Sequence, residues 1–399
     1  MIEPLQNRKI RVMHVTGPMN FGGAEVMMME LIRHKCVSTK VDFLIHQRSS
    51  AIGVEAAFDQ EIKSLGCSLH NIVTPVQSGI FKYLAAFKSV MEAEGVPDVI
   101  HIHLNARSGI VVLAAKLNGI KKIVVHSHAA LTFRGSTLYK IAANIELGIS
   151  KVLFAAFATD FWGCSQEAID SLFPKYFTRN TPRRIINNAI DVECYLNVSE
   201  VVAQSTREVM APSYDGLLLG TVGRIVAHKN VAFLVGVIEE LNAMGIAAKL
   251  AIVGREEDQA YLADMRKRAA VAGVEDQIIF LGARSDIAQV MSAFDVFVSP
   301  AIKEGFGLVG AEAQAAGTPC VLPTGFPEMV DMKLGLVTFV EQFSAPVWAN
   351  AIAKMAGKRC PRNEKISEAF SVAGFSAKEN TLQIERAYRD EKTPKGVLV

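Results

Sequence analysis

The sequence lacks long apolar runs, paired cysteines and a strong net charge, and each absence excludes a class of protein. The longest apolar stretch, residues 141–161, is interrupted by Glu146 and Lys151, so we expect a buried amphipathic helix and no membrane span. The six cysteines show no C-x-x-C or metal-ligand spacing, which fits a reducing compartment better than a disulfide framework or a zinc module. A net charge of +2 argues against a nucleic-acid binder. The N-terminal segment lacks the apolar stretch of a signal peptide, so we expect a cytoplasmic protein.

What the sequence does have is a repeated alternation of short β-branched runs with helix-length amphipathic segments. The runs are apolar almost throughout, as expected for strands buried on both faces of a doubly wound parallel sheet. A chain of 399 residues is too long for one compact core, so we expect two such domains. The expected strands are 11–16, 41–46, 68–73, 99–103, 123–127, 160–163 and 184–187, followed by 217–222, 249–253, 278–281, 296–299, 320–322 and 336–339.

The alternation pauses after about residue 191, and this pause sets the expected domain boundaries. We assign residues 1–195 to a first α/β domain, 196–215 to a linker and 216–372 to a second α/β domain. Residues 373–399 contain a last helix that we expect to pack back on the first domain. Ligands of open parallel sheets bind beyond the carboxyl ends of the strands, so two facing domains would enclose a cleft that suits transfer between two ligands.

The segment KEGFGLVGAE, residues 303–312, gives the sharpest functional signal. It follows an expected strand, and its glycines allow backbone N–H groups to approach an anion where a helix begins near Leu308. Glu304 lies on the turn and Glu312 in the helix. A carboxylate can accept from both hydroxyls of a diol, so Glu312 suits a ribose and Glu304 the sugar of a nucleotide diphosphate sugar. The alternative is one exposed turn glutamate and one ordinary helix glutamate.

A second signal is the segment GRIVAHKN, residues 223–230, which also follows an expected strand. Arg224 offers a fork that matches phosphate oxygens, and Lys229 offers a compact charge. Preorganised cations stabilise the charge that a diphosphate gains as its bond to the sugar breaks, and here they would replace a magnesium ion. No Asp-x-Asp motif, the usual anchor for such an ion, occurs in the sequence. The alternative is a solvated basic loop.

Two weaker signals lie in the first half of the chain. Gly22 and Gly23 stand between the first expected strand and its helix, where they suit close approach of a phosphate or a sugar, although a plain tight turn is equally consistent. His126 and His128 end one expected strand, and His101 and His103 end the strand before it. A metal site and a structural role both stay open for these histidines, and we favour an active-site histidine that faces the cleft.

Taken together, these segments resemble the family-4 retaining glycosyltransferases of the GT-B fold. The resemblance covers nearly the whole chain, is strongest in the segment 295–319, and points towards bacterial capsule and exopolysaccharide enzymes. It implies two Rossmann-like doubly wound domains that face an interdomain cleft. The matching segments are GGAE at 22–25, HSH at 126–128, GCSQEA at 163–168, INNAID at 186–191, GRIVAHKN at 223–230, FLGARSDI at 280–287 and DVFVSPAIKEGFGLVGAEAQAAGTP at 295–319.

The resemblance also implies roles for individual residues. Arg224 and Lys229 match the pair that holds the donor diphosphate, Glu304 the glutamate near the donor sugar, Glu312 the glutamate on the ribose, and His128 the histidine near the reacting carbon. No separate protein base is implied, because the leaving phosphate oxygen is thought to assist deprotonation of the acceptor. The other donor-binding positions are Gly22, Gly23, Gly223, Phe306, Gly307 and Leu308.

The sequence therefore predicts a retaining, metal-independent hexosyltransferase. It would move a sugar from a nucleotide diphosphate donor, expected to be a UDP-sugar, to a glycan or lipid-linked acceptor in polysaccharide biosynthesis. We expect no metal, no other cofactor and no nucleic acid, and a cytoplasmic location with peripheral contact at the inner membrane face. Two alternatives stay open, namely a nucleotide-sugar epimerase of the same fold and a catalytically silent nucleotide-sugar-binding subunit.

Overall fold

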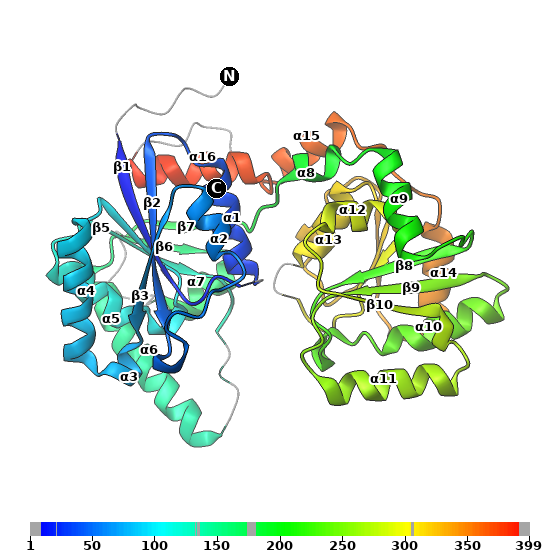
Figure 1. Cartoon of the computed structure of the whole chain (residues 1–399), viewed down its shortest axis with the longest axis horizontal. Coiled ribbons are helices and arrows are strands. Elements are labelled where there is room, and N and C mark those ends of the chain that lie inside the picture. The colour runs from blue at the N-terminus through cyan, green and yellow to red at the C-terminus, as the bar shows by residue number, and fades with distance from the viewer. Residues whose placement is uncertain are drawn as a thin grey trace. The chain divides into compact units, whose positions relative to one another are not determined.

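The computed structural model describes residues 9–20, 22–131, 133, 136–173, 181–304 and 307–390. The chain divides into two compact units (Figure 1). The first unit comprises residues 1–189 and 377–399, and the second comprises residues 190–376. Each unit is a parallel sheet covered by helices on both faces.

The first unit contains a seven-stranded sheet in the order β3-β2-β1-β4-β5-β6-β7, and all neighbouring strands run parallel. Parallel neighbours need a crossover, and helices supply most of these connections. The strands are β1 (Ile10–Thr16), β2 (Thr39–Gln47), β3 (Ser68–Val73), β4 (Val99–Ile102), β5 (Lys122–Ser127), β6 (Asp160–Gly163) and β7 (Arg183–Ile185). The helices are α1 (Gly23–His34), α2 (Asp59–Ser64), α3 (Pro75–Ser78), α4 (Ile80–Glu94), α5 (Gly109–Leu117), α6 (Thr137–Phe157), α7 (Gln166–Leu172) and α16 (Ala377–Tyr388).

Successive strand residues point to opposite faces, so each strand contributes to two cores. Met13 and Val15 of β1 pack with α4, α5 and α7 on one face, whereas Val12 packs with α1, α2 and α16 on the other. Helix α16 closes the first unit from the far end of the sequence and lies beside α1 (Figure 1). The stacked rings of Trp162 and Tyr388 join this helix to the sheet.

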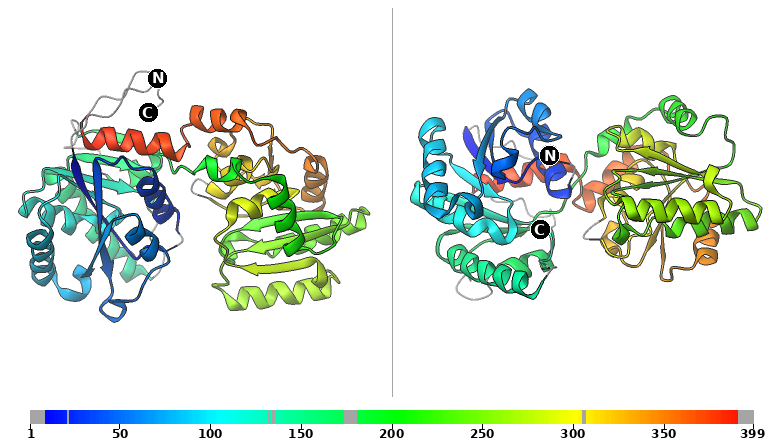
Figure 2. Two further views of the ribbon diagram at one scale, coloured as in Figure 1. Left: turned by 45° about the horizontal axis from the view of Figure 1, so that its top comes forward. Right: turned by 60° about the horizontal axis from the view of Figure 1, so that its bottom comes forward.

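The second unit contains a six-stranded parallel sheet in the order β10-β9-β8-β11-β12-β13. Helices α8, α9, α12, α13 and α15 pack on one face, and α10, α11 and α14 on the other (Figure 2). The strands are β8 (Leu217–Val222), β9 (Ala248–Val253), β10 (Ile278–Gly282), β11 (Val296–Val298), β12 (Cys320–Pro323) and β13 (Val337–Val340). The helices are α8 (Val192–Leu196), α9 (Glu200–Met210), α10 (Phe233–Ala243), α11 (Gln259–Val271), α12 (Ile287–Ala293), α13 (Leu308–Ala315), α14 (Ala345–Met355) and α15 (Glu364–Val372).

Two segments differ from the expected secondary structure. The segment 196–215, expected as a linker, contains helix α9, which belongs to the second unit and contacts α12. The segment 141–161, expected as a buried helix, forms most of α6, which buries Phe154 but leaves Ile145 and Ile149 more than half exposed. Within the described residues, no helix is long and apolar enough to cross a membrane.

Candidate active site

The loops after β8 and β11 leave the second sheet at its topological switch point. From β8 the chain continues to β9 on one side of the sheet, whereas β11 and β12 lie on the other side. At such a point the two loops leave the sheet in opposite directions. A ligand can then bind between them, at the carboxyl ends of both strands. Lys229 comes from the first loop and Glu304 from the second, so strand order alone brings these two predicted residues together.

The ammonium group of Lys229 forms an ion pair with the Glu304 carboxylate. The two side chains are 20% and 14% exposed, so water screens this pair less than it screens a pair on the open surface. Backbone hydrogen bonds hold the loops in place, because the Ile302 N–H donates to the His228 carbonyl at 3.2 Å and the Glu304 N–H donates to the Gly325 carbonyl at 3.3 Å. The predicted cation and carboxylate therefore lie side by side on two loops that backbone hydrogen bonds tie together.

Arg224 is not part of this ion pair. Its guanidinium lies 3.1 Å from the Glu257 carboxylate, and Arg255 approaches the same carboxylate at 3.4 Å. The Arg224 side chain is half exposed. It remains in the loop that carries Lys229, but its guanidinium pairs with Glu257 and not with Glu304.

The turn before α13 gives the predicted anion site its shape. Gly307 takes a φ of +79° as the N-cap residue of α13, so the helix begins with a residue that has no side chain over its end. Leu308 is the first helical residue, and Glu312 lies half-buried one turn further on. Phe306 lies outside the described residues. A helix start of this kind leaves backbone N–H groups unpaired and favours negative charge.

Substitution of Gly307 tests how tightly this turn is built. A Cβ atom at Gly307 would lie 2.3 Å from the ring of Phe326, and the φ of +79° disfavours any side chain. We expect Gly307→Ala to lower the free energy of unfolding by clearly more than the ~1 kcal/mol that the backbone conformation costs alone. Gly335→Ala is a matched control, because Gly335 has a φ of +73° and nothing within 4 Å of its Cβ position. Equal losses in urea titrations of the two variants would contradict a crowded turn.

The first unit has its own switch point between β1 and β4, and Gly22 and Gly23 follow β1 there. Gly22 is the N-cap residue of α1, which begins at Gly23. A Cβ atom at Gly22 would lie 2.2 Å from an oxygen of Glu25, whereas Gly23 has nothing within 4 Å. Burial raises the pKa of the Glu25 carboxyl beside this helix start.

The predicted His128 lies at the edge of a layer of five histidines: His14 on β1, His101 and His103 at the end of β4, and His126 and His128 at the end of β5. Because side chains alternate along a strand, all five point to the face that α1 and α16 cover. We call these five residues the histidine layer. His128 is half-buried, and the other four are buried.

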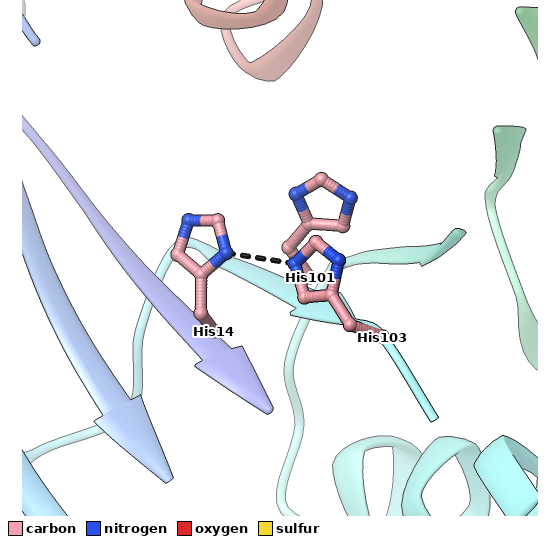
Figure 3. Close-up of side chains that lie close together, drawn as sticks. All are labelled: His14, His101 and His103. Carbon is pink, nitrogen blue, oxygen red and sulfur yellow. Dashed lines mark hydrogen bonds between the residues drawn. The ribbon is translucent and has the colours of Figure 1, made fainter. Parts of the chain in front are cut away.

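Hydrogen bonds divide the histidine layer into two chains. In the first, His14 Nδ1 lies 2.8 Å from His103 Nε2 (Figure 3). His103 Nδ1 in turn lies 2.7 Å from His128 Nε2. In the second, the Tyr388 hydroxyl lies 2.6 Å from His101 Nδ1, and His101 Nε2 lies 3.1 Å from His126 Nδ1.

Burial keeps the histidine layer neutral. It lowers the pKa of His128 to about 4 and, together with charge repulsion from His128, that of His14 to about 3. The pKa values of His101, His103 and His126 lie well below the ordinary range, chiefly because burial disfavours the charged ring and also because neighbouring histidines repel a proton. At neutral pH these rings therefore offer lone pairs and N–H groups without charge.

The sequence analysis did not single out His14 or Tyr388. A lone histidine within the apolar run of β1 carries no pattern of its own. The register places His14 directly opposite His101, a pairing that follows only once β1 and β4 are known to be neighbours. Tyr388 enters because α16 returns to the first unit.

A comparison with known proteins places the chain in a family. Residues 216–358 match the model of the family described as "Glycosyl transferases group 1". Over 386 residues, which cover 95% of this chain and 96% of the relative, the chain is 32% identical to the Bacillus subtilis (strain 168) protein named "Putative glycosyltransferase EpsF". The chain belongs to the group 1 glycosyltransferases. It is also 27% identical to a D-inositol 3-phosphate glycosyltransferase of Corynebacterium glutamicum (strain R), over 57% of this chain and 56% of that one.

Solved structures agree on the fold of this glycosyltransferase. Anabaena Alr3699/HepE, determined in complex with UDP, superposes with a TM-score of 0.75 at 18% identity and covers 96% of this chain and all of its own. A glycosyltransferase from Rickettsia africae ESF-5 superposes with the same TM-score at 16% identity, over 96% of this chain and 98% of its own. The predicted α/β fold of GT-B type, with two Rossmann-like parallel sheets, is confirmed.

Proposed function

We propose that the chain is a retaining, metal-independent hexosyltransferase. It takes a sugar from a UDP-sugar and transfers it to a glycan or a lipid-linked acceptor in exopolysaccharide biosynthesis. The single observation that carries the proposal is the Lys229–Glu304 ion pair at the switch point of the second sheet. The UDP found in HepE and the relationship to EpsF support the choice of donor and process.

In this proposal the donor site itself contains the negative charge that balances Lys229. Before the donor binds, Glu304 neutralises Lys229, so neither group is left buried and unpaired. The incoming diphosphate takes over Lys229, and Glu304 is released to accept from a sugar hydroxyl. Glu312 accepts from the ribose hydroxyls, and the backbone N–H groups at Gly307 and Leu308 bind phosphate oxygens.

Arg224 and Lys229 act on the leaving diphosphate. As the bond to the sugar breaks, the diphosphate gains negative charge, and two positioned cations stabilise that charge in the transition state. For this Arg224 leaves Glu257 and turns to the phosphates, a movement that its half-exposed side chain permits. The glycines Gly22, Gly23 and Gly223 let the backbone come close to the donor. His128 approaches it with a neutral ring. We place the reaction in the cytoplasm, with peripheral contact at the membrane that supplies a lipid-linked acceptor.

A chelator tests whether the reaction needs a metal ion at the diphosphate. We expect the release of UDP from a panel of UDP-sugars to proceed equally fast with and without EDTA, because Lys229 and Arg224 do the work of a magnesium ion. A rate that EDTA abolishes and magnesium restores would contradict metal independence. Tight donor binding without any turnover would instead favour a silent binding subunit.

A further inference from the structure

The histidine layer leaves buried nitrogen atoms that its own hydrogen bonds do not satisfy. These atoms are Nε2 of His14, Nε2 of His126 and Nδ1 of His128. An unpaired buried polar atom costs about 1–3 kcal/mol, so a ligand that completes even one of them, such as His126 Nε2, stabilises the layer. Among the described residues, the side-chain groups of this layer that could hold a metal contain only histidines. The bound species must therefore suit neutral imidazole.

We propose that His103, His126 and His128 form a binding site for one late first-row transition-metal ion, such as zinc. The three residues offer nitrogen atoms that all lie within 4.8 Å of one another. Tetrahedral ligands of one zinc ion lie roughly 3.3–3.4 Å apart at Zn–N distances of 2.0–2.1 Å, so the hydrogen-bonded rings of His103 and His128, at 2.7 Å, must separate slightly while His126 approaches. Neutral imidazole suits zinc, cobalt, nickel and copper, whereas magnesium and calcium need oxygen ligands.

The hydrogen bonds of the layer support this choice of ligands. If the ion takes His103 Nδ1, His128 Nε2 and the unpaired His126 Nε2, only the hydrogen bond between His103 and His128 is lost. The remaining N–H groups of His103 and His126 keep their partners. His103 Nε2–H donates to His14 Nδ1, and His126 Nδ1–H donates to His101 Nε2.

Metal-bound histidines in proteins typically donate their second N–H in this way, which orients the ring and raises its basicity. His101 can pass the effect on, because its Nδ1–H then donates to the Tyr388 hydroxyl oxygen at 2.6 Å. His14 and His101 are therefore positioning residues, and the five histidines divide into three ligands and two supports.

Another triple, His14, His101 and His103, also offers nitrogen atoms within 4.8 Å of one another (Figure 3). It is less suitable for two reasons. Both nitrogens of His101 and both of His103 already have hydrogen-bond partners, so a metal there would break at least two bonds, whereas the first triple loses one. All three side chains are fully or almost fully buried, whereas the half-buried His128 gives the first triple an approach for an ion from solvent and room for water as a fourth ligand.

The site shares His128 with the proposed donor site but none of the cations of that mechanism, and cobalt binding is measured without a donor, so the two proposals can fail separately.

The test is a titration of the purified full chain, stripped with chelator, with cobalt(II) as a visible probe and zinc as competitor. We expect one ion per chain, displaced by zinc and not by magnesium. His126→Gln should weaken cobalt binding roughly 100-fold or more, and His14→Gln, which removes a support, by about 10–100-fold. His46→Gln is the matched control, because His46 is a buried histidine of the same unit that bonds to Tyr83 outside the layer.

Two results would overturn the proposal. One is a wild-type chain that binds neither cobalt nor zinc at micromolar concentrations. The other is a folded His126→Gln chain that binds cobalt as tightly as the wild type, which would place the ion elsewhere. If circular dichroism shows that His126→Gln is unfolded, His128→Gln at the half-buried edge of the layer replaces it, and undiminished binding by that variant overturns the proposal equally.

Discussion

Replacement of Lys229 by alanine should reduce the turnover of a UDP-sugar about 10²–10³-fold, and replacement of Glu304 by alanine should do the same. This loss corresponds to about 2.7–4 kcal/mol of barrier, the amount lost when one preorganised charge-stabilising group is removed from an active site. Lys229→Ala removes the cation that meets the developing charge of the diphosphate. Glu304→Ala removes the sugar contact and also the group that holds Lys229 in position before the donor binds.

The measurement is UDP release under saturating donor, with folding checked by circular dichroism. Asp264→Ala is a suitable control, because it breaks the exposed ion pair of Asp264 with Arg268 on α11 of the same unit. An exposed pair contributes little to stability, so this variant should keep the wild-type rate. Wild-type rates in correctly folded Lys229→Ala and Glu304→Ala chains would refute the assigned roles.

The first unit should lose its stability in mild acid while the second unit stays folded. Burial lowers the pKa of His14 to about 3 and those of His46 and His128 to about 4, whereas an unfolded histidine titrates near 6.5. Below pH 6.5 the unfolded state therefore binds protons that the folded state refuses, and stability falls as the pH falls towards 4.

Each such histidine lowers the free energy of unfolding by up to about 1.4 kcal/mol per pH unit in this window. The three groups together give roughly 4 kcal/mol per pH unit, and His101, His103 and His126 shift in the same direction. From pH 6.5 to pH 5 the three groups remove up to about 6 kcal/mol, which exhausts a total stability at the lower end of the usual range of about 5–15 kcal/mol.

The two tryptophans separate the two units in this experiment. Trp162 is buried in the first unit and Trp348 in the second. Fluorescence of a Trp348→Phe chain thus reports on the first unit, and that of a Trp162→Phe chain reports on the second. Acid unfolding of both units at the same pH, or a first unit that survives unchanged to pH 4.5, would show that the histidine layer does not control acid stability.

The strands were predictable because their apolar runs are continuous and bounded by turns. The range expected for β8, residues 217–222, is the observed one, and α13 begins at Leu308 as expected. Helix α9 was not predictable, because tertiary contacts hold it in place. Arg207 donates to Asp295 at 2.8 Å and to the Gly216 carbonyl at 2.7 Å, and neither partner is evident from the local sequence.

The sequence singled out the candidate site residues but could not give their arrangement. Motif spacing singled out Lys229 and Glu304 separately, whereas their contact depends on β8 and β11 being neighbours in the sheet. The placement of Arg224 against Glu257 could not be foreseen either, because Glu257 lies in the loop after β9. His14 joins the other histidines only through the register of β1 and β4.

The most direct test of the account is whether UDP binds to the second unit through Lys229. A ligand that binds only the folded state at about 100 times its dissociation constant adds about 2.7 kcal/mol of stability. We therefore expect saturating UDP to raise the thermal midpoint of Trp348 fluorescence in the Trp162→Phe chain by several degrees, and to raise it far less when Lys229→Ala is added. An unchanged midpoint with UDP, or an equal rise in both chains, would contradict the account.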